Sequence, residues 1–159
     1  MDERIKACCF TGHRPEKLTK TENDICNSLE KEIRLAIADG FTKFLSGMAR
    51  GTDIYAAEIV LKIRAEDPSV KLICASPFEG FEQSWKQSWQ ARYHTIISAA
   101  DQVQYISPSY NRACFQVRNK WLILNSARVI AVYNGTPGGT KNTIDLANRH
   151  GVPVHIIEA

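Results

Sequence analysis

Short apolar runs alternate with longer amphipathic segments along the whole chain. The apolar runs are predicted to be strands, and they cover residues 5–11, 43–46, 70–75, 102–106, 129–133 and 154–157. The segments between them repeat apolar residues every three or four positions, which is typical of helices, and they cover residues 21–39, 52–64, 82–99, 113–126 and 140–150. This alternation predicts an α/β fold, with a Rossmann-like, open and mainly parallel sheet and helices on both faces.

The segment at residues 21–39 gives the clearest helical signal. Ile25, Leu29 and Ile33 fall on one face at helical spacing. Thr21 is a suitable N-cap residue, and Gly40 suits the position just after the last helical turn. A helix with both ends marked in this way is predicted from local sequence alone.

Length and composition predict one soluble domain over residues 1–159. Of the 159 residues, 44% are hydrophobic and 23% are charged, which is ordinary for a globular protein. No apolar run approaches the roughly 20 residues that span a bilayer, so no membrane partner is expected. The acidic residues near the start are not typical of a signal peptide, and we therefore expect a cytoplasmic location.

The net charge and the cysteine content limit the kinds of ligand and partner that we expect. The net charge is only +3 and the basic residues are scattered, which argues against nucleic acid as the main partner. The five cysteines form no CxxC pair and the four histidines lie far apart, so neither a metal site nor a cofactor is expected. Composition leaves self-association into a homo-oligomer open.

Ligands of open parallel sheets bind at the carboxyl ends of the strands, and three loops at such positions are unusual. The first follows the strand at residues 5–11. Gly12 permits close approach of the backbone to a ligand, and Arg14 can form a bidentate pair with a phosphate. The residues predicted to contact a ligand here are Thr11, Gly12, His13 and Arg14.

The second loop carries two glycines immediately before the helix predicted at residues 52–64. The N-terminus of that helix can attract an anion, and Thr52 or Asp53 is expected to cap it. Glu58 lies among apolar positions of the same helix and faces either the pocket or solvent. The residues predicted to contact a ligand here are Gly47, Met48, Ala49, Gly51, Thr52, Asp53 and Glu58.

The third loop follows the strand at residues 129–133. Gly138 and Gly139 let the backbone fold around a bound group. Thr140 can cap the following helix while its hydroxyl contacts a phosphate, and Thr143 lies one turn later. Gly138, Gly139, Thr140 and Thr143 complete the predicted phosphate-binding edge.

Other polar and aromatic residues have both structural and functional interpretations. Arg118 and Asn119, near the start of a helix, can contact a ligand from the far side of the pocket. Trp85 and Trp89, four residues apart, are more typical of a core than of a base-stacking platform. Tyr110 lies in a polar loop, where an aromatic ring could close over a base.

The chain carries neither the P-loop pattern nor the GxGxxG dinucleotide fingerprint. It has TGHRP at 11–15, SGMARGTD at 46–53 followed by Ala57-Glu58, Arg118-Asn119, and GGT at 138–140. In this combination and order it resembles the YpsA-like branch of the SLOG superfamily, which also holds the DprA DNA-processing proteins and the LOG (lysine-decarboxylase-like) phosphoribohydrolases.

The resemblance implies a Rossmann-like fold that binds nucleotides or nucleotide-derived ligands. The LOG enzymes cleave an N-glycosidic bond with an Arg and with the Glu of a PGGxGTxxE motif. Here the sequence PGG at 137–139 matches the start of that motif, but Lys141 and Asn142 replace its Gly-Thr. Asp145 stands where the Glu would be and is one methylene shorter.

Three functions follow from these observations. The first is a ligand-binding or sensor module for a nucleotide-like, phosphorylated small molecule. The second is an enzyme that hydrolyses a nucleotide N-glycosidic bond, for which the candidate catalytic residues are Asp53, Glu58, Asp145 and His13. The third is DprA-like binding of single-stranded DNA, against which the modest charge argues.

Overall fold

A computed structural model describes residues 3–159 and contains one six-stranded sheet in which every neighbouring pair of strands is parallel. The strand order is β4-β3-β2-β1-β5-β6. The strands are β1 (Ala7–Gly12), β2 (Lys43–Ser46), β3 (Lys71–Ser76), β4 (Gln102–Tyr105), β5 (Arg128–Tyr133) and β6 (Val154–Glu158). The predicted α/β class and the Rossmann-like sheet are confirmed.

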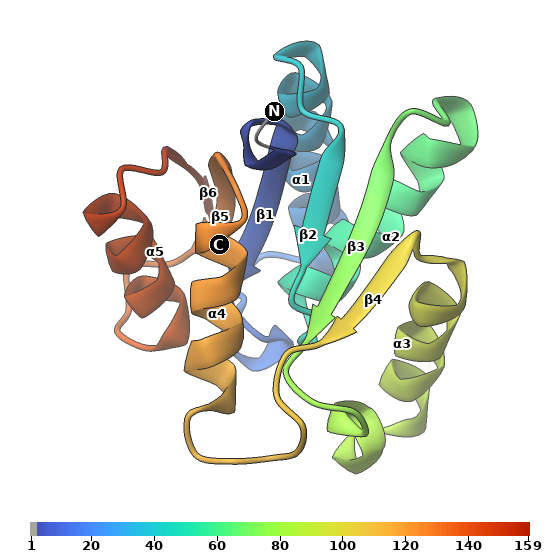
Figure 1. Cartoon of the computed structure of the whole chain (residues 1–159), viewed down its shortest axis with the longest axis vertical. Helices are drawn as coiled ribbons and strands as arrows, with labels where there is room; N and C mark the ends of the chain where they lie inside the picture. Colours follow the sequence, from blue (N-terminus) through green and yellow to red (C-terminus); the bar gives the residue numbers. More distant parts are fainter. Residues whose placement is uncertain (1–2) are drawn as a thin grey trace.

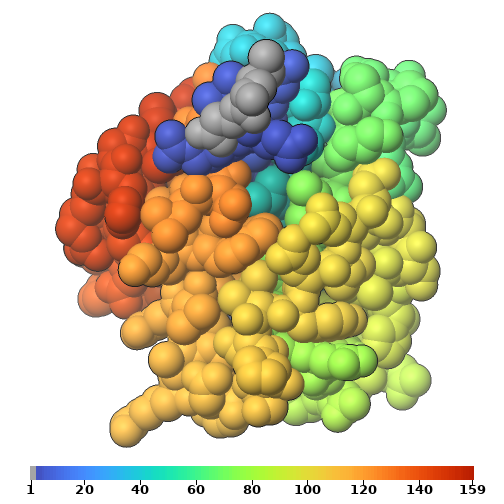
Figure 2. Space-filling view, viewed as in Figure 1, coloured from blue at the N-terminus to red at the C-terminus, as the bar shows by residue number. Residues whose placement is uncertain are grey.

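The helices cover both faces of the sheet, as predicted. They are α1 (Glu22–Ala38), α2 (Thr52–Glu66), α3 (Gln87–Ala99), α4 (Cys114–Leu124) and α5 (Gly139–Arg149), with short 3₁₀ turns η1 (Glu3–Lys6), η2 (Pro15–Lys17) and η3 (Phe81–Ser84). In Figure 1, α4 and α5 lie in front of the sheet and α1 and α2 lie behind it. Figure 2 shows the front face, where α5, α4 and the segment around β4 lie side by side.

Strand β1 shows why these sequences form buried central strands. Cys8 and Phe10 are packed in the core on the α1–α3 side, whereas Ala7 and Cys9 belong to the core on the α4–α5 side. A parallel strand covered on both faces needs apolar residues at successive positions, not in alternation. For this reason the continuous apolar runs in the sequence predicted the positions of the strands.

Helix α1 confirms its predicted ends. The Thr21 hydroxyl accepts a hydrogen bond from the Asp24 N–H at 3.1 Å, which satisfies one of the first-turn amides. Gly40, just beyond the helix, has a φ of +101°, a conformation that glycine adopts without a steric penalty.

The predicted helix at residues 82–99 is wrong at its start. The chain forms η3, becomes extended at Trp85 and Lys86, and then begins α3 at Gln87. The side-chain amide of Gln90 donates hydrogen bonds to the carbonyls of Gln83 and Trp85, which stabilises this break. The first predicted strand also begins later than expected, because η1 occupies its first residues.

The order of the strands locates the functional edge. Successive strands β2, β3 and β4 extend the sheet on one side of β1, and the chain then crosses to the other side of β1 to form β5. The carboxyl ends of β1 and β5 thus flank the point where the strand order reverses, which is where open α/β sheets bind ligands. Across the part of the chain that the structure describes, no helix has the length and apolarity to cross a membrane.

Candidate functional site at the carboxyl edge of the sheet

His13 joins the loops that follow β1 and β5. Its ring nitrogen Nε2 accepts the backbone N–H of Asn134 at 3.1 Å, so the neutral ring carries its proton on Nδ1, which lies 3.5 Å from the Thr140 hydroxyl. Burial, opposed in part by the Asn134 hydrogen bond, lowers the pKa of His13 below its ordinary value. Both ring nitrogens are therefore engaged by protein groups, and His13 holds the site together in its neutral form.

The loop after β1 packs directly against the start of α2. A Cβ on Gly12 would lie 2.4 Å from the Thr52 side chain, and a Cβ on Gly51 would lie 2.8 Å from the His13 carbonyl oxygen. That carbonyl accepts a hydrogen bond from the Thr52 hydroxyl at 3.1 Å and from its N–H at 3.4 Å. The two glycines are thus required for the two loops to approach each other.

Neither Thr52 nor Asp53 caps α2, contrary to the prediction. Gly51, with a φ of +86°, is the N-cap residue and no side chain caps the helix. The Thr52 hydroxyl binds His13 instead, and Asp53 Oδ2 accepts the Ala49 N–H at 3.2 Å. A protein carbonyl therefore already occupies part of the anion-attracting end of α2.

The loop after β2 is anchored at Met48. Its side chain is fully buried and its φ of +64° lies in the left-handed region that non-glycine residues seldom adopt. The Ser46 hydroxyl accepts the Met48 N–H at 3.2 Å and donates to the Asp53 carbonyl at 2.9 Å. These contacts hold a costly backbone conformation in place.

The buried side chains of Arg118 and Asp53 lie behind the same loop, close enough for their charges to interact. The Arg118 guanidinium donates to the Gly47 carbonyl and to the Asn119 side-chain oxygen. A Cβ on Gly47 would lie 3.0 Å from both the Arg118 guanidinium and Asp53 Oδ2, so a side chain at this position would press on both groups. Arg118 and Asn119 were predicted to contact a ligand from the far side of the pocket. In the structure they lie beneath the loop that follows β2, where Arg118 binds the Gly47 carbonyl.

Asp53 is the most perturbed carboxylate at this edge. Burial raises its pKa to about 6, although the Arg118 charge and the Ala49 N–H both lower it. Within residues 3–159, Asp53 Oδ1 is buried without a hydrogen-bond partner. This group can change its protonation state near neutral pH.

The loop after β5 leads into α5 with open space beside Gly139, whereas a Cβ on Gly138 would lie 3.1 Å from Lys17 Nζ. Gly138 is the N-cap residue with a φ of +143°, so Thr140 does not cap α5 as predicted; its hydroxyl lies near His13 instead. Thr143 donates to the Gly139 carbonyl at 2.9 Å. Apart from its chain neighbours and the backbone of its own helix, a Cβ on Gly139 would meet no atom of residues 3–159 within 4 Å. Lys17, which was not among the predicted site residues, donates to the Pro137 carbonyl at 3.2 Å and brings a positive charge to this loop.

Glu58 and Asp145 are each held in an ion pair. Glu58 contacts Arg92 at 2.6 Å, and Arg92 also contacts Glu22 at 3.1 Å, so this cluster ties α1, α2 and α3 together. Asp145 contacts Lys141 at 2.7 Å along α5. The structure brings His13, Asp53, Arg118 and the three glycine loops to one edge, but it places these two carboxylates in separate clusters.

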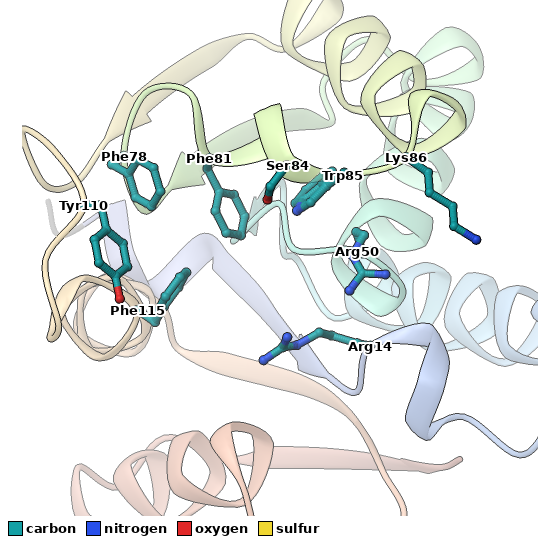
Figure 3. A pocket seen from close by; sticks show the side chains of 9 residues that line it. All are labelled: Arg14, Arg50, Phe78, Phe81, Ser84, Trp85, Lys86, Tyr110 and Phe115. Carbon is teal, nitrogen blue, oxygen red and sulfur yellow. The ribbon is translucent and has the colours of Figure 1, made fainter.

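A pocket of about 500 Å³ opens beside the loops after β1 and β2. Figure 3 shows aromatic side chains along one side and the arginines of the two loops opposite them. Its lining residues are Arg14, Arg50, Phe78, Phe81, Ser84, Trp85, Lys86, Tyr110 and Phe115. The pocket therefore combines cationic groups with aromatic rings.

Of these residues, Arg14 was among the predicted ligand contacts, whereas Arg50, Phe78, Phe81 and Phe115 were not. A signal was present, because Phe78, Phe81 and Trp85 directly follow the carboxyl end of β3 and Arg50 lies between the two glycines of the second loop. Trp89 is not part of the pocket; it packs against Tyr55 and Arg92. Among residues 3–159, no group of three or more His, Cys, Asp or Glu side chains is arranged to hold a metal ion.

Solved structures with the same fold include two DNA processing proteins. DNA processing protein A from Streptococcus pneumoniae has a TM-score of 0.70 and 19% identity, and the alignment covers 99% of this chain and 52% of that chain. The protein from Helicobacter pylori, described for its single-stranded DNA binding mode, has a TM-score of 0.65 and 20% identity, with 96% and 65% covered. At these identities the likeness concerns the fold, and this chain spans only about half to two thirds of their length.

The sequence has curated relatives in Bacillus. UPF0398 proteins from Bacillus cereus (strain G9842) and Bacillus thuringiensis (strain Al Hakam) are each 29% identical to it over 160 residues, covering 92% of this chain and 85% of the relative. A sequence model of the YspA SLOG family matches residues 8–158, so that the three glycine loops and the helices that follow them lie within the match. The chain belongs to the YspA SLOG family.

Proposed function

We propose that this protein is a ligand-binding module for a nucleotide or a nucleotide-derived phosphorylated small molecule. The observation that carries the proposal is the pocket, in which Arg14 and Arg50 from two glycine-marked loops face a wall of aromatic side chains. Guanidinium groups bind phosphates through paired hydrogen bonds, and aromatic rings bind planar bases. Both chemistries lie at the edge where the sheet topology favours ligands.

Arg14 is the best candidate for the phosphate contact. Its side chain is exposed, and within residues 3–159 it makes no hydrogen bond or ion pair. Arg50, in contrast, contacts the Glu16 carboxylate at 2.5 Å, which neutralises part of its charge. Membership of the YspA SLOG family, together with the first turn of α5 and Lys17 nearby, also supports an anionic ligand.

Replacing Arg14 with alanine is expected to weaken nucleotide binding at least about tenfold, because hydrogen bonds to charged groups each contribute about 1.5–3 kcal/mol. Isothermal titration calorimetry of AMP and other nucleoside phosphates against wild type and Arg14→Ala measures this. Arg149→Ala is a matched control, since it removes the same charge from the end of α5 at the opposite edge of the sheet. Equal affinities of wild type and Arg14→Ala would show that Arg14 does not contact the ligand. If no nucleotide bound to the wild-type protein, the proposed function would be wrong.

Single-stranded DNA is a second candidate ligand. The aromatic and cationic lining of the pocket is also suited to unstacked bases and backbone phosphates, and the fold is shared with DNA processing protein A. The net charge of +3 favours the small ligand, because DNA binding normally draws on several phosphate contacts and is strongly salt-dependent. Titration of oligo-dT at low and high salt separates the two candidates.

The N-glycosidase alternative depends on Asp53. Glu58 is paired with Arg92 and Asp145 with Lys141. Of the three candidate carboxylates, only Asp53 therefore lies at the loop edge without an ion-pair partner among residues 3–159. The binding-module proposal predicts that incubation with nucleoside monophosphates releases no free base. Release that Asp53→Asn abolishes would instead establish the enzyme.

A further inference from the structure

The aromatic side of the pocket is built from segments that meet only in the folded chain. Phe78, Phe81 and Trp85 come from the segment after β3, and Tyr110 and Phe115 come from the loop and helix after β4. Their ring centroids are separated by 5.0 Å for Phe81–Trp85, 5.6 Å for Phe81–Phe115 and 5.8 Å for Phe78–Tyr110. These five rings, which we call the aromatic wall, form one continuous set of contacts.

The aromatic wall is not sealed into the core. Tyr110 is 65% exposed and Phe115 is 38% exposed, and both side chains line the pocket. Large aromatic groups left open to water at a concave site are typical of ligand-binding surfaces, because covering them releases water from apolar area. The exposed rings of the wall can therefore be covered by a planar aromatic group of a ligand.

The opposite side of the pocket limits what that occupant can be. Arg14 and Arg50 place two guanidinium groups across from the rings, and the single carboxylate of Glu16 pairs with Arg50. An apolar ligand would leave these charges unused, whereas a purely anionic ligand would leave the rings uncovered. A molecule with an aromatic base at one end and a phosphate at the other satisfies both sides.

Building on the proposed nucleotide-binding function, we propose that the aromatic wall is the base-binding subsite and that it selects ligands carrying a purine base. The base stacks on the wall, and the phosphate extends to Arg14. A volume of about 500 Å³ is within the range of small-molecule pockets and leaves room for one nucleoside. Purines are favoured over pyrimidines because their larger ring system covers more of the wall.

The test uses ligands that carry one end of the molecule or both. AMP carries the base and the phosphate, adenosine carries only the base, and ribose 5-phosphate carries only the phosphate. Calorimetry with wild type and with Tyr110→Ala is expected to show that the variant weakens AMP and adenosine binding about tenfold and leaves ribose 5-phosphate binding unchanged. Arg14→Ala is expected to weaken the binding of AMP and ribose 5-phosphate and to leave adenosine binding unchanged.

Tyr110 is a suitable position because its side chain is mostly exposed, so its removal does not disturb the core. Tyr105→Ala is the matched control, because Tyr105 is 41% exposed on β4 and is not among the pocket-lining residues. If AMP binds Tyr110→Ala and Tyr110→Ala/Phe115→Ala as tightly as wild type, or if ribose 5-phosphate binds as tightly as AMP, the base-binding subsite is refuted while nucleotide binding stands.

Two other results of the binding experiments would have a different meaning from the loss of the base-binding subsite. If no nucleotide binds wild type, the proposed function itself fails. If only oligodeoxynucleotides bind, with a steep salt dependence that Tyr110→Ala weakens, then the wall serves a nucleic acid and the mononucleotide proposal is overturned.

Discussion

Replacing Gly12 with alanine is expected to destabilise the fold by about 3 kcal/mol, at the upper end of the usual cost of overpacking a core. The added methyl group would lie 2.4 Å from Thr52, a fully buried residue whose hydroxyl is bound to the His13 carbonyl. Thr52 cannot move away without breaking that hydrogen bond and shifting the start of α2. For a chain of this size the melting temperature is expected to fall by roughly 6–12 °C, which thermal unfolding followed by circular dichroism measures.

Gly139→Ala is the matched control for this prediction. A Cβ at Gly139 would meet nothing within 4 Å among the described residues, and alanine is the better helix former. Its melting temperature is therefore expected to equal or slightly exceed that of wild type. If Gly12→Ala were as stable as Gly139→Ala, the close packing of the β1 loop on α2 would be wrong. A loss of nucleotide affinity in Gly139→Ala without loss of stability would indicate that a ligand approaches the start of α5.

Replacing Arg118 with methionine is expected to cost about 3–5 kcal/mol at pH 8, because it leaves the buried Asp53 carboxylate without its compensating charge. The same change removes the donor to the Gly47 carbonyl. Methionine keeps most of the buried volume, so the loss arises mainly from charge and hydrogen bonding. Urea unfolding of wild type and Arg118→Met measures the difference.

The cost of removing Arg118 is expected to be smaller at pH 5 than at pH 8. In the folded protein the pKa of Asp53 is about 6, above its ordinary value of 3.8, so the fold favours the protonated carboxyl. The stability that this group contributes is present in full below the unfolded-chain pKa and is lost as the pH rises through the folded-state pKa. Arg118 lowers the folded-state pKa, so without it the loss on ionisation grows.

The double variant Arg118→Met/Asp53→Asn separates the two causes. Asparagine cannot ionise, so the pH-dependent part of the loss is expected to disappear while the cost of the missing Gly47 hydrogen bond remains. An Arg118→Met variant that lost the same stability at pH 5 and pH 8 would show that Asp53 does not titrate in the folded protein.

Local sequence predicted the strands and α1 well, because apolar runs and capping residues act within a few positions. It also placed the three glycine loops at one edge, since all strands of a parallel sheet end on the same side. It failed at the helix starts after Gly51 and Gly138. There Thr52 and Thr140, which would suit an N-cap, both contact His13 instead.

The remaining features of the site depend on contacts between distant parts of the chain. His13 meets Asn134 across 121 residues, and Arg118 meets the Gly47 carbonyl across 71 residues. The aromatic wall was missed for the same reason, because Phe81 and Phe115 become neighbours only when the segments after β3 and β4 fold together. Taken alone, Trp85 had the spacing of a core residue and Tyr110 lay in a polar loop, so neither residue indicated that the five rings come together.

A crystal structure of the protein grown with AMP would show directly whether a nucleotide binds between the arginines and the aromatic wall. We expect a nucleotide at the carboxyl edge of the sheet, with its phosphate within hydrogen-bonding distance of the Arg14 guanidinium and its base against Phe81 and Tyr110. A nucleotide bound at the opposite edge of the sheet, or an unchanged and empty pocket at saturating AMP, would contradict it.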